Sequence, residues 1–160
     1  MKITPRFLLA FLLVVSAPLF AADPAAPASK PGDYPHGPDS QPQEGVPKGE
    51  LKGPFEFRSQ IIAGTVRQYW VYVPAQYTAG KPACLLVFQD GQRATNPAPN
   101  ASLRVPQVME NLIHKKEMPV TIGLFITPGQ RGETYPAAGQ GNPNNRAQEY
   151  DSLGDDYGRA

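Results

Sequence analysis

The stretch Ala83-Cys84-Leu85-Leu86-Val87-Phe88-Gln89-Asp90-Gly91-Gln92 decides the predicted fold of this 160-residue chain. The five apolar residues from Cys84 to Phe88 do not alternate with polar ones. Such an unbroken run is typical of a strand buried on both faces of a parallel sheet. In sheets of this kind ligands bind just beyond the carboxyl ends of the strands. We therefore expect a central strand here, with Gln89 to Gln92 at a reactive rim of the sheet.

A second apolar run, Val120 to Ile126, follows a predicted helix. Pro106 lies near the first turn of that helix, where proline is well tolerated. The apolar residues at helical spacing on one face are Val108, Met109, Leu112 and Ile113. His114 falls in the last turn, where a cation suits the helix dipole, and this explains it better than a catalytic role. A strand, a helix and a strand within about forty residues predict a βαβ unit with a right-handed crossover.

Upstream of the buried run, two strands are predicted to pair as an antiparallel hairpin at the edge of the sheet. From Phe55 to Ile61 apolar and polar residues alternate, which is the period of a half-buried strand. A turn at Ala63-Gly64 leads to a strand from Val66 to Val73, rich in aromatic and β-branched residues. The predicted fold class is therefore α/β, with an antiparallel edge hairpin followed by a parallel βαβ unit.

Two long loops are predicted to leave the same rim of this sheet. One follows Gly91, and the other runs from Thr127 to Asn145 and is rich in glycine and proline. Loops of this length in a compact domain are more often functional than idle. We expect a cleft between them.

The amino-terminal third has a different composition. Residues 1–21 have the parts of a secretory signal: a basic start, an apolar run over residues 7–15, and small residues at 21 and 22. We expect cleavage after Ala21 or Ala22 and a periplasmic or secreted product. The alternative is an uncleaved membrane anchor, but the apolar run over residues 7–15 is shorter than the ~20 residues of a membrane span. Residues 22–53 are rich in proline and glycine and are predicted to be a linker or extended arm. The folded domain would occupy residues 54–160.

Charge and cysteine content exclude several classes of partner. The net charge is +1, and Lys115-Lys116 is the largest basic cluster. Nucleic acid and anionic membrane surfaces are therefore poor candidates, and no stable membrane partner is expected after signal cleavage. The single cysteine, Cys84, cannot form an internal disulfide and is predicted to be a small core residue. His36 lies in the arm without potential metal-binding neighbours, and we expect no metal and no cofactor.

Several segments resemble the amino-terminal half of exported bacterial esterases, in the enterochelin-esterase-like branch of the α/β-hydrolase fold. The segments are Arg67 to Pro74, Leu85 to Gly91 and Arg146 to Asp151. The leader Gly45 to Glu50 is similar to the lead-in of these proteins. Together they cover residues 45–160, and their order and spacing match the family.

The resemblance implies an α/β-hydrolase-type sheet and a serine esterase for siderophore, feruloyl or sugar esters, with a small-molecule or sugar ester as its partner. In such hydrolases the loop after this strand donates a backbone N–H to the oxyanion hole, and the matching residue is Gln92. Asp90 and Gly91 would line the substrate side, Gly91 permitting a close backbone turn; an ordinary turn is the alternative. Arg146 and Glu149 are also predicted to bind the substrate, Arg146 through an acyl or phenolate oxygen. The alternative is a local Arg146–Glu149 ion pair.

The sequence does not contain the family's full catalytic triad. The nearest imitation of the Gly-x-Ser-x-Gly elbow surrounds Ser152, which has Tyr150 where the sharp turn needs a small residue and no strand before it. We therefore reject Ser152 as the nucleophile. Neither His36 nor His114 lies at the expected position. A helix-opening capping box at Ser152-Leu153-Gly154-Asp155, close to the last residue, predicts that the domain is cut short before the nucleophile elbow.

Two other functions are open at this point. The first is a non-catalytic exported carbohydrate-binding module, all-β, with an exposed aromatic row formed by Tyr69, Trp70, Tyr72 and Tyr77. The second is a truncated product without activity. The helix predicted between two apolar strands argues against the all-β module.

Overall fold

A computed structural model of the chain describes residues 36–95, 103–137 and 140–159. The chain divides into two units, residues 1–35 and residues 36–160, and every described residue belongs to the second. The predicted signal sequence, its cleavage point and the first part of the predicted linker lie outside the described residues.

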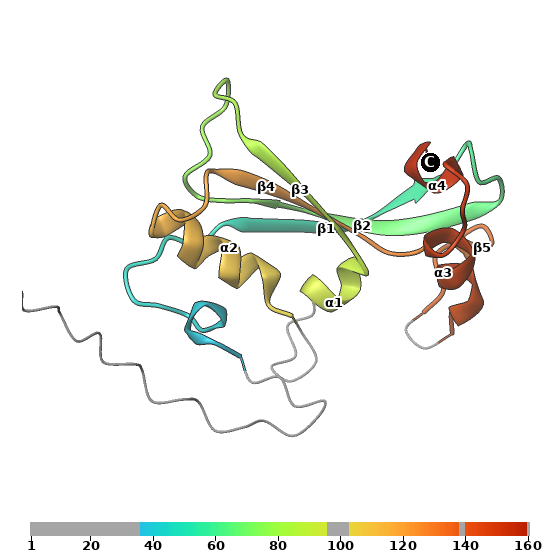
Figure 1. Ribbon diagram of the computed structural model, residues 1–160, viewed down its shortest axis with the longest axis horizontal. Helices are drawn as coiled ribbons and strands as arrows, with labels where there is room; N and C mark the ends of the chain where they lie inside the picture. Colours follow the sequence, from blue (N-terminus) through green and yellow to red (C-terminus); the bar gives the residue numbers. More distant parts are fainter. Residues whose placement is uncertain (1–35, 96–102, 138–139, 160) are drawn as a thin grey trace, which may run out of the picture. The chain divides into compact units, whose positions relative to one another are not determined.

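The second unit is built on an open mixed sheet of five strands (Figure 1). Four strands lie in the order β1-β2-β4-β3, and β5 pairs with β2. Their bounds are β1 (Glu50–Arg58), β2 (Thr65–Val73), β3 (Cys84–Gln89), β4 (Thr121–Ile126) and β5 (Gln130–Arg131). β1 and β2 are antiparallel, whereas β3 and β4 are parallel. The α/β class, the edge hairpin and the parallel pair are thus confirmed.

The helices of the described residues are α1 (Gly91–Thr95), α2 (Val105–His114), α3 (Pro143–Tyr150) and α4 (Asp156–Arg159), with a 3₁₀ turn, η1 (Pro38–Ser40). α2 is the helix predicted between the two apolar runs. α1 corrects the prediction of a loop directly after Gly91. α3 begins two residues before the predicted end of the second loop, because the Asn142 side chain accepts a hydrogen bond from the N–H of Asn144 and Pro143 suits the first turn.

β3 is an edge strand of the described sheet, which corrects the prediction of a central strand buried on both faces. It pairs with β4 alone among the described strands. Leu85 is 65% exposed and Val87 is 54% exposed. Cys84 is exposed as well, so the prediction that it is a core residue was wrong. The apolar run identified a strand correctly, but it carried no information about which neighbours cover that strand.

β1 is also more exposed than its alternating pattern predicted. It begins at Glu50, inside the stretch assigned to the linker, and all its residues are exposed. It ends at Arg58, since Ser59 turns the chain by accepting hydrogen bonds from the N–H groups of Ile61 and Ile62. The prediction of a half-buried strand running to Ile61 was therefore wrong: β1 is an edge strand, and its residues on both faces, Phe55 and Phe57 included, remain exposed.

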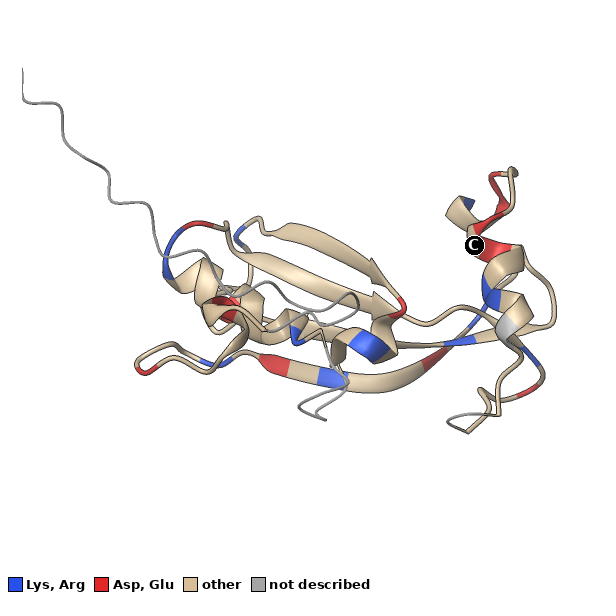
Figure 2. Ribbon diagram, turned by 60° about the horizontal axis from the view of Figure 1, so that its bottom comes forward, with Lys and Arg blue, Asp and Glu red and all other residues tan. Residues whose placement is uncertain are grey.

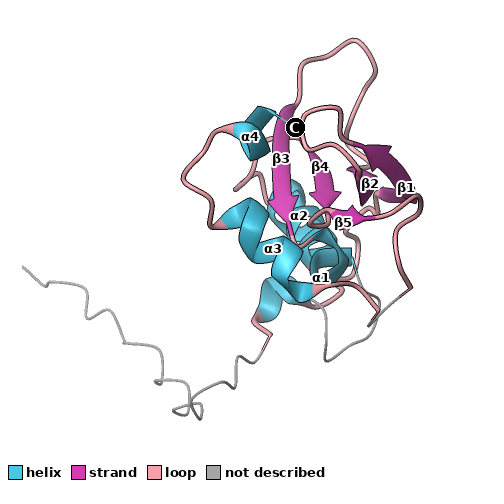
Figure 3. Cartoon of the chain, turned by 90° about the vertical axis from the view of Figure 1, so that its right-hand side faces the viewer, coloured by secondary structure: helices cyan, strands magenta, loops and turns pink. Residues whose placement is uncertain are grey.

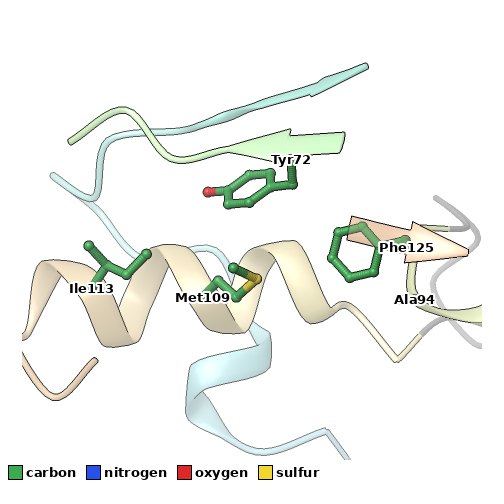
Figure 4. Close-up of a cluster of buried hydrophobic side chains, with 5 residues drawn as sticks. All are labelled: Tyr72, Ala94, Met109, Ile113 and Phe125. Atoms are coloured by element: carbon green, nitrogen blue, oxygen red, sulfur yellow. The ribbon is translucent and has the colours of Figure 1, made fainter. Parts of the chain in front are cut away.

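The core lies between the sheet and the first two helices. It consists of Tyr72, Ala94, Met109, Ile113 and Phe125 (Figure 4). Alternate residues of each strand point into it, so Leu86 and Phe88 of β3 pack against this cluster while their neighbours face away. Burial of these side chains holds α1 and α2 on one face of the sheet.

Residues 36–49 lie along α2 and are attached by polar contacts. The side-chain amide of Asn111 donates to the carbonyl oxygens of Asp39 (2.7 Å) and Gln41 (2.9 Å). The N–H of Gly49 donates to the Glu110 carboxylate at 3.0 Å. This segment leads directly into β1.

Candidate functional site

The candidate site lies where the two parallel strands end. Figure 3 shows the arrows of β3 and β4 pointing the same way, toward the end of the sheet where α1 and α3 lie. Asp90 and Gly91 follow β3 directly, and Thr127 follows β4. This is the rim on which the sequence predicted the site residues, and it is where ligands bind in parallel α/β sheets.

Gly91 brings the chain into close contact with the end of β4. A Cβ atom at this position would lie 2.5 Å from the backbone nitrogen of Ile126 and 2.5 Å from the carbonyl carbon of Phe125. No side chain fits there, because both neighbours are backbone atoms. Asp90, just before it, has a φ of 56°, in the left-handed region that few non-glycine residues adopt. The turn is therefore tightly constrained.

Arg146 holds this turn from α3. Its Nε donates to Oδ1 of Asp90 at 2.9 Å, and its Nη2 donates to Oδ2 at 2.7 Å. Such a bidentate arginine–carboxylate pair fixes orientation as well as distance. The hydrogen bond to Asp90 raises the pKa of Arg146 further above its ordinary value. Two predicted site residues thus meet, and the alternative of a local Arg146–Glu149 pair was wrong.

Tyr150 makes the second contact with the turn. Its hydroxyl accepts a hydrogen bond from the N–H of Asp90 at 3.4 Å. The Tyr150 ring packs edge-on against Tyr157, with ring centroids 5.1 Å apart. Burial, with Tyr157 nearby, raises the pKa of Tyr150 well above its ordinary value, so the phenol stays neutral.

Glu149 is buried and ties α3 to the sheet. Its Oε1 accepts a hydrogen bond from Nη2 of Arg67 at 2.7 Å, and its Oε2 accepts one from the N–H of Gly129, also at 2.7 Å. The Arg67 side chain is 1% exposed and the Glu149 side chain 6%. Arg67 also lies over the ring of Tyr157, at 5.7 Å from its centroid. The sequence offered one signal for this partner: an arginine inside a strand otherwise rich in large apolar residues.

Gln92 lies in the first turn of α1, and its side chain is exposed. The amides of a first helical turn have no carbonyl partner one turn earlier. The N–H of Arg93 bonds instead to the carbonyl oxygen of Asp90 at 2.8 Å. The structure therefore places Asp90, Gly91, Gln92 and Arg146 at one end of the sheet, with Glu149 directed away from them toward Arg67.

Two cavities adjoin α4. One, of about 280 Å³, lies between the sheet and α4 and is lined by Phe57, Arg67, Val87, Gln89, Ile126, Tyr157 and Gly158. The other, of about 200 Å³, is lined by Ile62, Thr65, Arg131, Asn145, Gln148, Glu149, Ser152, Asp156 and Tyr157. Ser152 thus has no histidine among its neighbours in this cavity, and its hydroxyl donates only weakly, at 3.5 Å, to the carbonyl oxygen of Glu149. This agrees with its rejection as a nucleophile.

Within the described ranges, no group of three or more histidine, cysteine, aspartate or glutamate side chains is placed to hold a metal ion. No helix in the same ranges is long and apolar enough to cross a bilayer.

The close approach at Gly91 predicts the effect of a single methyl group. We expect Gly91→Ala to lower the free energy of unfolding by about 1–3 kcal/mol, because its Cβ overlaps the backbone of β4. Gly154→Ala is the matched control, since a Cβ there meets nothing within 4 Å. Urea unfolding followed by circular dichroism measures both. Equal stabilities of the two variants would contradict the constraint.

The buried ion pair predicts a large cost for removing one charge. We expect Glu149→Gln to lower the free energy of unfolding by about 3–5 kcal/mol, because Arg67 is left buried without a counter-charge. Asp155→Asn serves as the control: it removes the exposed partner of Arg159, which lies 3.9 Å away. The control should change stability by less than about 0.5 kcal/mol. Calorimetry distinguishes the two, and a Glu149→Gln variant as stable as the control refutes the prediction.

No protein-family model matches this chain, and no curated protein sequence matches it. The esterase resemblance therefore rests on the segments Arg67 to Pro74, Leu85 to Gly91 and Arg146 to Asp151.

Proposed function

We propose that this chain forms the oxyanion side of the active site in an exported serine ester hydrolase with an α/β-hydrolase-type sheet. One observation carries the proposal: the Asp90-Gly91 turn follows β3, packs against the end of β4, and is held from α3 by Arg146 and Tyr150. An oxyanion hole requires a donor that is fixed before the reaction begins. A turn constrained from both sides supports such a donor at the next residue.

In this proposal the backbone N–H of Gln92 binds the oxygen on which charge develops. A serine hydroxyl attacks the ester carbonyl carbon while a histidine takes its proton, and the carbonyl electron pair moves to oxygen. Collapse of this intermediate breaks the ester C–O bond, and the histidine returns the proton to the departing alcohol. Water then hydrolyses the acyl-enzyme in the same way. The nucleophilic serine and the histidine are proposed to lie outside these 160 residues.

The other predicted site residues take distinct parts. Arg146 positions the turn through Asp90, and because its side chain remains 51% exposed it can still meet an acyl or phenolate oxygen of a substrate. Both carboxylate oxygens of Glu149 are engaged within the protein, so it acts by holding α3. The substrates implied by the resemblance are siderophore, feruloyl or sugar esters, and the proposed location is the periplasm or the exterior.

The alternative of a carbohydrate-binding module has less support. It predicted an all-β domain, whereas α2 covers one face of the sheet. The predicted row of exposed aromatic side chains does not form. Tyr72 is buried, and Trp70 packs against the core on the same face of the sheet. Tyr69 lies on the opposite face. Tyr69 itself packs against Phe55, with ring centroids 5.3 Å apart.

The first test is an assay of the chain alone. We expect no hydrolysis of p-nitrophenyl acetate above the buffer rate, because the described residues do not bring a serine and a histidine together at the turn. Ser152→Ala should behave identically. Hydrolysis that disappears in Ser152→Ala contradicts both the prediction and the rejection of Ser152.

The second test has two steps. The DNA downstream of the codon for Ala160 is sequenced, and the longer protein that its open reading frame encodes is produced and assayed. The proposal expects a Gly-x-Ser-x-Gly motif after a further helix and strand, and esterase activity. In that protein Gln92→Pro, which deletes one backbone N–H, should lower kcat by about 10²–10³. Proline is tolerated in a first helical turn, and Gln92→Ala keeps the N–H and is the control. A frame without the motif, or equal kcat in both variants, contradicts the proposal.

A further inference from the structure

The segment that precedes β1 folds back along helix α2, and we call residues 36–49 the strap. It lies within the stretch predicted to be a linker or extended arm. Its first part is η1, in which the N–H of Gln41 donates to the carbonyl oxygen of Pro38 at 3.1 Å. η1 lies beside α2 in Figure 1. This part of the arm therefore has a defined place on the domain.

One polar stripe along α2 binds the strap. The side-chain amide of Asn111 donates to two carbonyl oxygens of the strap, at 2.7 and 2.9 Å. Arg104, just before the helix, donates from Nη1 to the carbonyl oxygen of Ser40 at 3.2 Å. Lys115, just after the helix, forms an ion pair with Asp39. Residues 104, 111 and 115 are separated by seven and four positions, a spacing that places them on one side of a helix.

α2 is thus held on two sides by different chemistry. Met109 and Ile113 pack into the apolar core beside the sheet. In Figure 2, β3 and β4 are tan throughout, whereas the strap includes residues of both charge signs. The strap is therefore a second, polar attachment of α2, separate from the apolar core.

The strap also accounts for two buried polar side chains of α2. Asn111 is 0% exposed and Glu110 is 7% exposed. The Glu110 carboxylate accepts a hydrogen bond from the N–H of Gly49 at 3.0 Å. The backbone packs tightly at the same point, since a Cβ at Gly49 would lie 2.5 Å from Cζ of the Tyr72 ring. Buried polar groups in native proteins are normally hydrogen-bonded, so departure of the strap would leave both side chains without these partners.

The contacts of the strap reach α1 through Arg104. Arg104 has a φ of 51°, in the left-handed region that a non-glycine residue adopts only when its surroundings hold it there. Directly before it, the N–H of Leu103 donates to the carbonyl oxygen of Arg93 in α1 at 2.9 Å. Ala94 of α1 is buried in the same core cluster as Met109 of α2. α1 is therefore attached both to α2 and to the residue next to Arg104.

We propose that the strap positions α1, with Arg104 and Asn111 as the positioning residues. The strap holds the start of α2, Arg104 keeps its left-handed backbone, and Leu103 stays bonded to α1. The functional consequence rests on the proposed function, because the first turn of α1 carries the Gln92 N–H. The strap then fixes the oxyanion donor from one side of the turn, as α3 does from the other. The contacts themselves do not depend on ester chemistry.

Amide hydrogen exchange of the full chain tests the hold on α1 without any substrate. Gln41→Pro removes the N–H that closes η1, and proline disfavours the helical conformation of Ser40 before it. Gln41 is exposed, so the change leaves the core intact. We expect exchange about tenfold faster at the amides of Leu103 and Arg93, while β2 and β4 keep their protection.

Glu44→Pro is the matched control, a second proline in the same strap. Glu44 lies in a turn in which the N–H of Val46 donates to the carbonyl oxygen of Gln43. Gly45 has a φ of 76°, and proline suits the position before such a glycine. This variant should exchange like the unmodified chain.

Asn111→Leu approaches the same contact from the helix, because it removes both donors to the strap. It should accelerate exchange at Leu103 and Arg93 as Gln41→Pro does. Unchanged exchange at these two amides in either variant overturns the proposal. Faster exchange throughout β2 and β4 overturns it as well, since the strap would then support the whole domain and not α1 in particular.

The longer protein encoded beyond Ala160 tests the functional consequence. There Gln41→Pro should lower kcat about tenfold and leave KM within about twofold, because an oxyanion donor acts mainly in the transition state. An unchanged kcat with accelerated exchange overturns the role of the strap at the oxyanion donor. A longer protein without esterase activity contradicts the proposed function alone, because the exchange results do not depend on it.

Discussion

The buried contact between Arg67 and Glu149 is the interaction on which the arrangement of the candidate site depends. Glu149 receives hydrogen bonds from β2, through Arg67, and from the loop after β4, through Gly129. These contacts fix α3 at the end of the sheet. Because α3 also carries Arg146 and Tyr150, fixing the helix brings both side chains to Asp90. One buried carboxylate thus determines where the turn after β3 is held.

The two sets of helices are attached by different forces. α1 and α2 pack through Ala94, Met109 and Ile113, whose burial is non-directional. α3 and α4 contribute no buried hydrophobic side chain among the described residues and are held by ion pairs, hydrogen bonds and the tyrosine contacts. A buried ion pair is costly to desolvate, and it is favourable only when its geometry is satisfied. This dependence on geometry is consistent with the position of α3, whose Arg146 and Tyr150 side chains both contact Asp90.

Local sequence patterns predicted strands β1 to β4 and helix α2 correctly. The burial of each element and the partners of its side chains depend on residues that are distant along the chain. The alternation and β-branched content of the hairpin, and the helical spacing around Met109, depend on a few adjacent residues and gave correct elements. The position of β3 at an edge depends on its pairing with β4, where Cys84 lies opposite Thr121, 37 residues further along the chain. The partner choice of Arg146 depends on a contact across 56 residues. Arg146 and Glu149 are close enough along the chain to pair with each other. Arg146 binds Asp90 instead, and Glu149 binds Arg67, because α3 lies between these two residues of the sheet and its rim.

The central claim is that the Arg67–Glu149 contact holds α3, and through it the Asp90 turn. Amide hydrogen exchange in Arg67→Met, compared with the unmodified chain, tests this most directly. The account predicts faster exchange along α3 and at the Asp90 amide, with α2 still protected. Unchanged protection of α3 and Asp90, or a uniform loss that includes α2, would contradict it.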